Sequence, residues 1–236
     1  MSATPRDAAP TMRAAVGALL RKELRLELRT LQVIPAMALF SITTLVVFHF
    51  SLQADSVEGP LAAGVLTITL LFSAILGINR LFVADHEEGG FDGFLLAPVD
   101  RTSMLVAKAL ALGVFLVILE LIAVPAFGLM LLEPALTGAA LGQTVVVLLL
   151  ADVAIAVVGT LVGALAIQTR ARDLIVPLIA LPLLLPVVIG TAKALAPTFA
   201  AAGAGALPGA WLTILGLYDL VFGLLAYAVF DFLLED

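Results

Sequence analysis

The 236-residue chain contains no cysteine and few charged residues. The absence of cysteine excludes disulfides, thiolate metal sites, thioether attachment of haem and cysteine nucleophiles. Only 13% of the residues are charged, whereas soluble domains carry about a quarter. Because 62% of the residues are apolar, a single core of this length could not bury them, and the composition predicts an integral membrane protein.

Motifs for common chemistry are also missing. No GxxxxGK[ST] segment occurs, so the chain does not bind ATP through a P-loop, and no enzymatic activity is expected. His49 and His86 are predicted on opposite sides of the membrane and cannot hold a haem between them. His49 as a single axial ligand and His49 as a polar residue at the membrane surface both stay open. The segment DHEEGG has one histidine among flexible acids, which is too weak a pattern for a metal site.

Six charge-poor apolar runs are each close to the ~20 residues that cross ~30 Å of hydrocarbon. Transmembrane strands would be about half as long and would alternate apolar with polar residues. We therefore predict an all-α membrane protein in which residues 1–30 form a cytoplasmic N-terminus with an interfacial amphipathic helix, and residues 31–236 a six-span domain. The expected spans are 33–50, 59–79, 104–132, 140–167, 174–192 and 209–230.

The basic residues predict the orientation of these spans. With both termini inside, all of the twelve lysines and arginines except Lys193 lie on one side. The positive-inside rule makes that side cytoplasmic. No secretory signal is expected, since the first apolar run is too long and follows about thirty polar residues.

The stretch AAVGALLRKELRLELRTL predicts an amphipathic helix with a basic face and a leucine face. Glu23 and Glu27 fall in the middle of the leucine face. Carboxylates buried in lipid are costly, so we expect this face to pack partly on protein through Glu23 and Glu27. An ordinary interfacial anchor is the alternative.

Two cytoplasmic loops are candidate contacts for a partner. In DHEEGGFDGFLLAPVDR, two glycines break a helix and a short amphipathic turn follows, which suits insertion into a groove. A solvated loop is equally compatible with the pattern. The later loop offers Arg170 and Arg172, as a second contact or as a plain positive-inside anchor. The coupling residues expected in the first loop are Asp85, Glu87, Glu88, Phe91, Asp92, Phe94 and Leu95.

Three acids are predicted inside the membrane: Glu120, Asp152 and Asp219. Ionisable residues at this depth suggest a function by default. They would serve a proton relay, or, as protonated carboxyls, simply hydrogen-bond neighbouring helices. The fifth span also contains three prolines, which predicts a kinked helix whose freed carbonyls need partners from other helices.

Several segments along the chain point to a known family. The stretch EEGGFDGFLLAPVDRTSMLVAKAL resembles the first cytoplasmic loop of ABC-2 type transporter permeases. Together with KELRLELR, LIVPLIALPLLLPVVIGTAKA and WLTILGLYDLVFGLLAYAVFDFLLE, it is similar to the CcmB family, the haem exporter permeases of cytochrome c maturation. The similar segments span nearly the whole chain.

The resemblance implies a homodimeric permease in the bacterial cytoplasmic membrane, docked on a separate ABC ATPase through a coupling helix at Asp85–Pro98. ATP would act through that subunit, with haem as a possible substrate, no directly bound cofactor and no nucleic acid. A haem-handling membrane protein is a further implied partner. A proton-coupled secondary transporter using Glu120, Asp152 and Asp219, or a membrane scaffold without transport activity, is the alternative.

Overall fold

The computed structural model describes residues 11–52, 56–83, 101–133, 136–167, 169 and 171–233. These residues form helices and no strand, and six of the helices are long and apolar enough to cross a membrane. The protein is thus an all-α integral membrane protein, as the composition predicted. The helices are α1 (Met12–Thr30), α2 (Val33–Ser51), α3 (Gly59–Arg80), α6 (Arg101–Leu131), α7 (Gly138–Ile167), α8 (Arg172–Leu195) and α9 (Gly209–Leu233).

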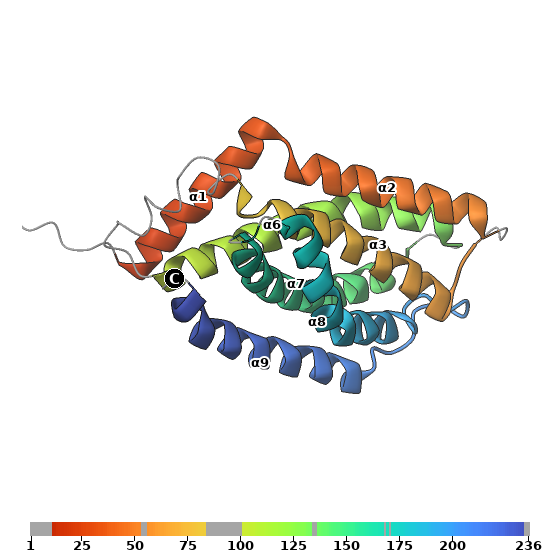
Figure 1. Cartoon of the computed structure of the whole chain (residues 1–236). Coiled ribbons are helices and arrows are strands. Elements are labelled where there is room, and N and C mark those ends of the chain that lie inside the picture. The colour runs from red at the N-terminus through yellow and green to blue at the C-terminus, as the bar shows by residue number, and fades with distance from the viewer. Residues whose placement is uncertain are drawn as a thin grey trace, which may run out of the picture.

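Helices α3 and α7 form the centre of the six-helix bundle, and α2 and α9 lie on its outside (Figure 1). Helix α7 packs against α3, α6, α8 and α9. Its approach to α3 depends on small residues: a Cβ at Gly159 would lie 2.7 Å from Ile78 Cγ1, and one at Gly163 3.0 Å from the Phe82 ring. Glycine therefore allows the closest contact between the two central helices.

The amphipathic helix α1 lies at one end of the bundle, inclined to α2 (Figure 1). Its basic residues are exposed, whereas Glu23 and Glu27 are buried and Leu20 and Leu24 pack against the core. The face of α1 that carries these glutamates packs against α6 of the same chain. The start of α6 and the end of α9 lie at this same end (Figure 1).

Helix α8 continues from Arg172 to Leu195 although it contains Pro177, Pro182 and Pro186. A proline cannot donate a backbone hydrogen bond, so carbonyls along such a helix depend on outside donors. The hydroxyl of Tyr218 on α9 donates to the carbonyl of Leu183 at 2.6 Å and so joins α9 to this helix.

The connection between α8 and α9 packs on the end of the bundle opposite α1 (Figure 1). Phe199 is buried, and its ring lies 5.4 Å from that of Phe127. The carbonyl of Phe199 accepts a hydrogen bond from Gly59 N at 2.7 Å. Gly59 has a positive φ of 52°, a conformation that favours glycine. Gln143 Nε2 donates to the Gly205 carbonyl at 2.9 Å. These bonds hold the connection between α8 and α9 against the bundle.

Candidate functional site

Two carboxyl groups meet inside the bundle. Glu120 lies in the middle part of α6 and Asp152 in that of α7, and their side chains are in hydrogen-bonding contact. Asp152 is 7% exposed, and none of the described residues that line the cavities beside the pair is basic. Two carboxylates in contact repel each other strongly where the dielectric constant is low. The pair must therefore hold a proton or a cation.

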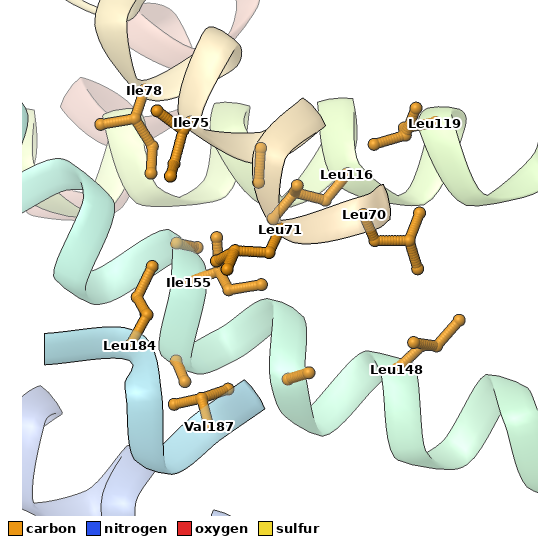
Figure 2. Packing of buried hydrophobic residues seen from close by; sticks show 14 of the residues in the cluster. Leu70, Leu71, Ile75, Ile78, Leu116, Leu119, Leu148, Ile155, Leu184 and Val187 are labelled. Atoms are coloured by element: carbon orange, nitrogen blue, oxygen red, sulfur yellow. The ribbon is translucent and has the colours of Figure 1, made fainter. Parts of the chain in front are cut away.

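A small cavity of about 20 Å³ adjoins this pair. Its described polar lining consists of Glu120, Asp152, Thr67 from α3 and Thr191 from α8. The rest of the wall is apolar, and Figure 2 shows its side chains converging from four helices. They include Leu70, Leu71, Leu116, Leu119, Leu148, Ile155, Leu184 and Val187.

A second, larger cavity of about 640 Å³ lies between α6, α7 and α9. We call it the lateral groove, because rim residues such as Leu110, Leu149 and Val153 are exposed on the outer surface of the bundle. As far as the described residues show, its wall is apolar apart from Thr102, Asp152 and Tyr227. Asp152 lines both cavities and so separates the buried one from the lateral groove.

At the α1 end, Lys108 forms a buried ion pair. This lysine is 3% exposed and lies seven residues into α6, about 10 Å along its axis. Its Nζ is 2.9 Å from Glu23 Oε2, donates to the Leu81 carbonyl at 2.7 Å and lies 5.0 Å from the centre of the Phe82 ring. Because a buried charge is tolerated only when it is paired, these contacts fix α1 to α6 and to the end of α3.

Glu27 joins α1 to α2. Its carboxylate accepts hydrogen bonds from the backbone N–H groups of Val33, at 3.0 and 3.1 Å, and Ile34, at 2.8 Å. Its own carbonyl accepts from Leu31 N at 2.7 Å, and Leu31 has a left-handed φ of 49° that ends α1. One residue therefore terminates the first helix and caps the free N–H groups of the next, where a negative charge is favourable.

Comparison with known proteins gives the family. A family model described as "CcmB protein" matches residues 14–232. The chain belongs to the CcmB family. It is 31% identical over 217 residues to "Heme exporter protein B" of Bradyrhizobium diazoefficiens, covering 91% of this chain and 96% of that protein. The identically named protein of Paracoccus denitrificans is 32% identical over 160 residues, covering 67% of this chain and 72% of the relative.

In this CcmB family member, two of the three predicted intramembrane acids come together. Glu120 and Asp152 touch, but Asp219 is outside both cavities around that pair. The Oδ1 atom of Asp219 has no hydrogen-bond partner within the described residues. Its neighbour Tyr218 stacks on Phe222 with ring centres 4.3 Å apart. A relay through all three acids would need a link that these contacts do not supply.

The predicted cytoplasmic contacts of the CcmB chain fall into two groups. The first-loop coupling residues and Arg170 lie outside the described residues, and Arg172 begins α8 with its side chain undescribed. Glu23 and Glu27 are described, and their carboxylates bond to groups of this chain. The use of all these residues in partner contacts stays a prediction.

Sequence reasoning missed the partners of the acids. It placed Lys108 among the positive-inside residues, and no pattern linked it to Glu23, eighty-five positions earlier. Thr67 and Thr191 gave no signal, because an isolated threonine in an apolar helix usually bonds to its own backbone. The Nδ1 atom of His49 lies 2.6 Å from the carbonyl oxygen of Met130, a partner that the sequence did not indicate, and its role as a haem ligand stays an open alternative.

Proposed function

We propose that this chain is the membrane subunit of an ATP-driven exporter complex for cytochrome c maturation, with haem or a haem carrier as cargo. The family match over residues 14–232 carries the proposal, supported by relatives named "Heme exporter protein B". Six apolar helices supply the membrane domain, and the sequence contains no P-loop of its own. The complex resides in the bacterial cytoplasmic membrane as a permease homodimer with both chain termini inside.

A separate ATPase subunit would supply the energy. We place its docking site on Asp85–Pro98 between α3 and α6, with Arg170 and Arg172 as a second contact. The helix ends that flank the first loop lie at the same end of the bundle as α1 (Figure 1), which supports a common docking side. A haem-handling membrane protein of the same assembly would bind elsewhere on the permease.

The lateral groove suits a large apolar cargo. Its volume of about 640 Å³ lies within the range of ~300–1,000 Å³ for small-molecule pockets. The described part of its wall carries no histidine, methionine or cysteine, so it offers haem an apolar surface but none of those axial ligands. A cargo held in this way would leave readily toward an acceptor that does bind the iron.

Groove-filling variants test this function. A Cβ added at Gly113 or Gly223, both in the groove wall, meets no heavy atom within 4 Å, so leucine at either position would start in open space and occupy part of the groove. Gly216→Leu on α9 is the matched control, since it has the same free space but lies outside the groove. In native membranes, Gly113→Leu and Gly223→Leu should abolish maturation of a reporter cytochrome c, and Gly216→Leu should not.

Co-purification tests the ATP-driven assembly itself. The tagged permease, extracted from native membranes in mild detergent, should retain an ABC ATPase subunit and a second copy of the permease. Identification of the retained chains by mass spectrometry is the readout. If no ATPase is retained and cytochrome maturation survives a Walker-site mutation in every candidate ATPase, the proposed mechanism is wrong.

Proton-coupled secondary transport is the second candidate function, and the contact between Glu120 and Asp152 favours it. Such a transporter would need no ATPase. Uptake into proteoliposomes that contain only the permease and carry a pH gradient separates the two mechanisms. Uptake that requires the gradient and is lost in Glu120→Gln would support this candidate.

A further inference from the structure

Three buried polar atoms in the centre of the bundle have no hydrogen-bond partner within the described residues: Thr67 Oγ1, Asp152 Oδ2 and Thr191 Oγ1. The three residues are 6%, 7% and 2% exposed. They come from α3, α7 and α8, and all line the same 20 Å³ cavity. A buried polar group without a hydrogen-bond partner is unfavourable in the membrane interior. Three such groups around one cavity indicate that a polar molecule occupies the cavity and bonds to them.

The two hydroxyls differ from those of three other buried threonines. Thr69, Thr144 and Thr160 each donate to the carbonyl four residues earlier in their own helix, at 2.7–2.8 Å. This local bond is the usual way in which a helical threonine satisfies its hydroxyl. Thr67 and Thr191 do not make it, so their hydroxyls are available to the cavity.

The cavity has the size and the partners that a water molecule needs. A buried water requires about 10–15 Å³ of such space and two to four polar partners. We propose that one water molecule bridges Thr67, Asp152 and Thr191, and that this water and the Glu120–Asp152 pair form a proton-binding site in the middle of the bundle. The site is independent of the cargo proposed above.

The surrounding charges favour a proton as the bound cation. Glu120 comes from α6 and Asp152 from α7, while α3 and α8 contribute only hydroxyls. Across the lateral groove, α9 contributes the phenol of Tyr227. Among the described residues no lysine or arginine lines either cavity, and Lys108 is paired with Glu23. One proton between the carboxyls would remove their repulsion, and the water would donate to the remaining carboxylate oxygen.

Asp152 gives this site a route to the outside. It is the residue common to the walls of the buried cavity and the lateral groove. A proton that enters through the groove therefore meets Asp152 first and then Glu120 and the water. Occupancy of the site would in turn hold four helices together through one hydrogen-bond network.

Infrared spectroscopy of the full chain in lipid nanodiscs tests the site. The wild type should show the carbonyl band of a protonated carboxyl that is absent from the double variant Glu120→Gln, Asp152→Asn. The double variant Thr67→Val, Thr191→Val removes partners that hold the water, so this band should shift, because the carboxyl pair loses the hydrogen bond that the water donates. Thr69→Val is the control on α3 and should leave the band in place, since its hydroxyl bonds only locally.

Three results would overturn the inference. The first is the absence of any protonated-carboxyl band that depends on Glu120 and Asp152 near neutral pH. The second is an unmoved band in the threonine double variant together with a higher Tm of that variant. This result would mean that the cavity is dry, because valine then replaces two hydroxyls that have no partner. The third is a band that disappears when sodium replaces choline at constant ionic strength, which would assign the site to a metal cation. The threonine variants keep the test decisive even if the carboxyl variant does not fold.

Discussion

Replacement of Lys108 by methionine should detach α1 from the membrane domain. The change keeps the length of the apolar stem but removes the charge that lies 2.9 Å from Glu23 Oε2. Glu23 would then be a buried carboxylate that keeps only the exposed Lys22, 3.4 Å from its Oε1, as an ionic partner. Breaking a buried pair in this way costs about 3–5 kcal/mol, whereas exposed pairs contribute about 0–1 kcal/mol.

The chain supplies a matched control for this change. Lys22 Nζ lies 3.4 Å from Glu23 Oε1 but its side chain is 47% exposed, against 4% for Lys108. Lys22→Met therefore removes the same charge from the same carboxylate at the surface and should cost less than about 1 kcal/mol. The double variant Glu23→Gln, Lys108→Met should recover part of the loss, because no buried charge remains unpaired.

Limited proteolysis in lipid nanodiscs measures the effect at its site. Trypsin cleaves α1 at its exposed arginines only when the helix separates from α6 and unwinds. A loss of about 3 kcal/mol raises the open population roughly 100-fold or more, so cleavage should accelerate by a similar factor in Lys108→Met. Equal cleavage rates for Lys108→Met and Lys22→Met would refute the reasoning and show that apolar contacts alone hold α1.

Four further outcomes are expected. Glu27→Ala should destabilise the α1–α2 junction by about 1–2 kcal/mol, because three N–H···O contacts at the start of α2 are lost, and trypsin protection would show it against Arg25→Ala as control. Phe94→Ala should weaken ATPase binding by ~2 kcal/mol or more, and Asp92→Ala should have a smaller effect that shrinks as salt rises, by titration at two salt concentrations. Asp219→Asn should leave cytochrome maturation intact, since Asp219 lines neither cavity beside the carboxyl pair; loss of function in an assembled variant would restore the three-acid relay. Cysteines introduced at Asp55, Glu133 and Lys193 should react with an impermeant maleimide in intact cells, whereas Arg101→Cys should not; the reverse pattern would mean an inverted topology.

The membrane-spanning helices could be located from the sequence because their length is set by the bilayer. The expected spans and the observed helices differ by no more than three residues at either end. Charge-free runs fix such boundaries, since a charge at the hydrocarbon edge is costly. The position of Glu23 and Glu27 within a leucine face was an equally physical signal that α1 packs on protein.

Which residues meet inside the bundle could not be predicted in the same way. A helix that is apolar all round, such as α7, has no sequence pattern that distinguishes its neighbours. Glu120 and Asp152 touch because of how α6 and α7 are rotated, and Asp219 lies apart for the same reason. Rotation follows from steric details such as the fit of Gly159 against Ile78, which composition and periodicity do not encode.

Helix α6 connects the two polar sites of the bundle. Lys108 and Glu120 are twelve residues apart on it, about 18 Å along the axis, and the proline in this helix, Pro125, lies beyond both. The intervening segment has an unbroken backbone and should move as a stiff unit, while α7 is held against α3 by the contacts at Gly159 and Gly163. A shift of α1 that pulls Lys108 would therefore move Glu120 relative to Asp152 rather than bend α6 between them. Under this arrangement, a partner that displaces α1 at one end of the bundle changes the contact between Glu120 and Asp152 in its centre. Lys108→Met should therefore alter the infrared band of the carboxyl pair, although Lys108 does not touch either carboxyl group.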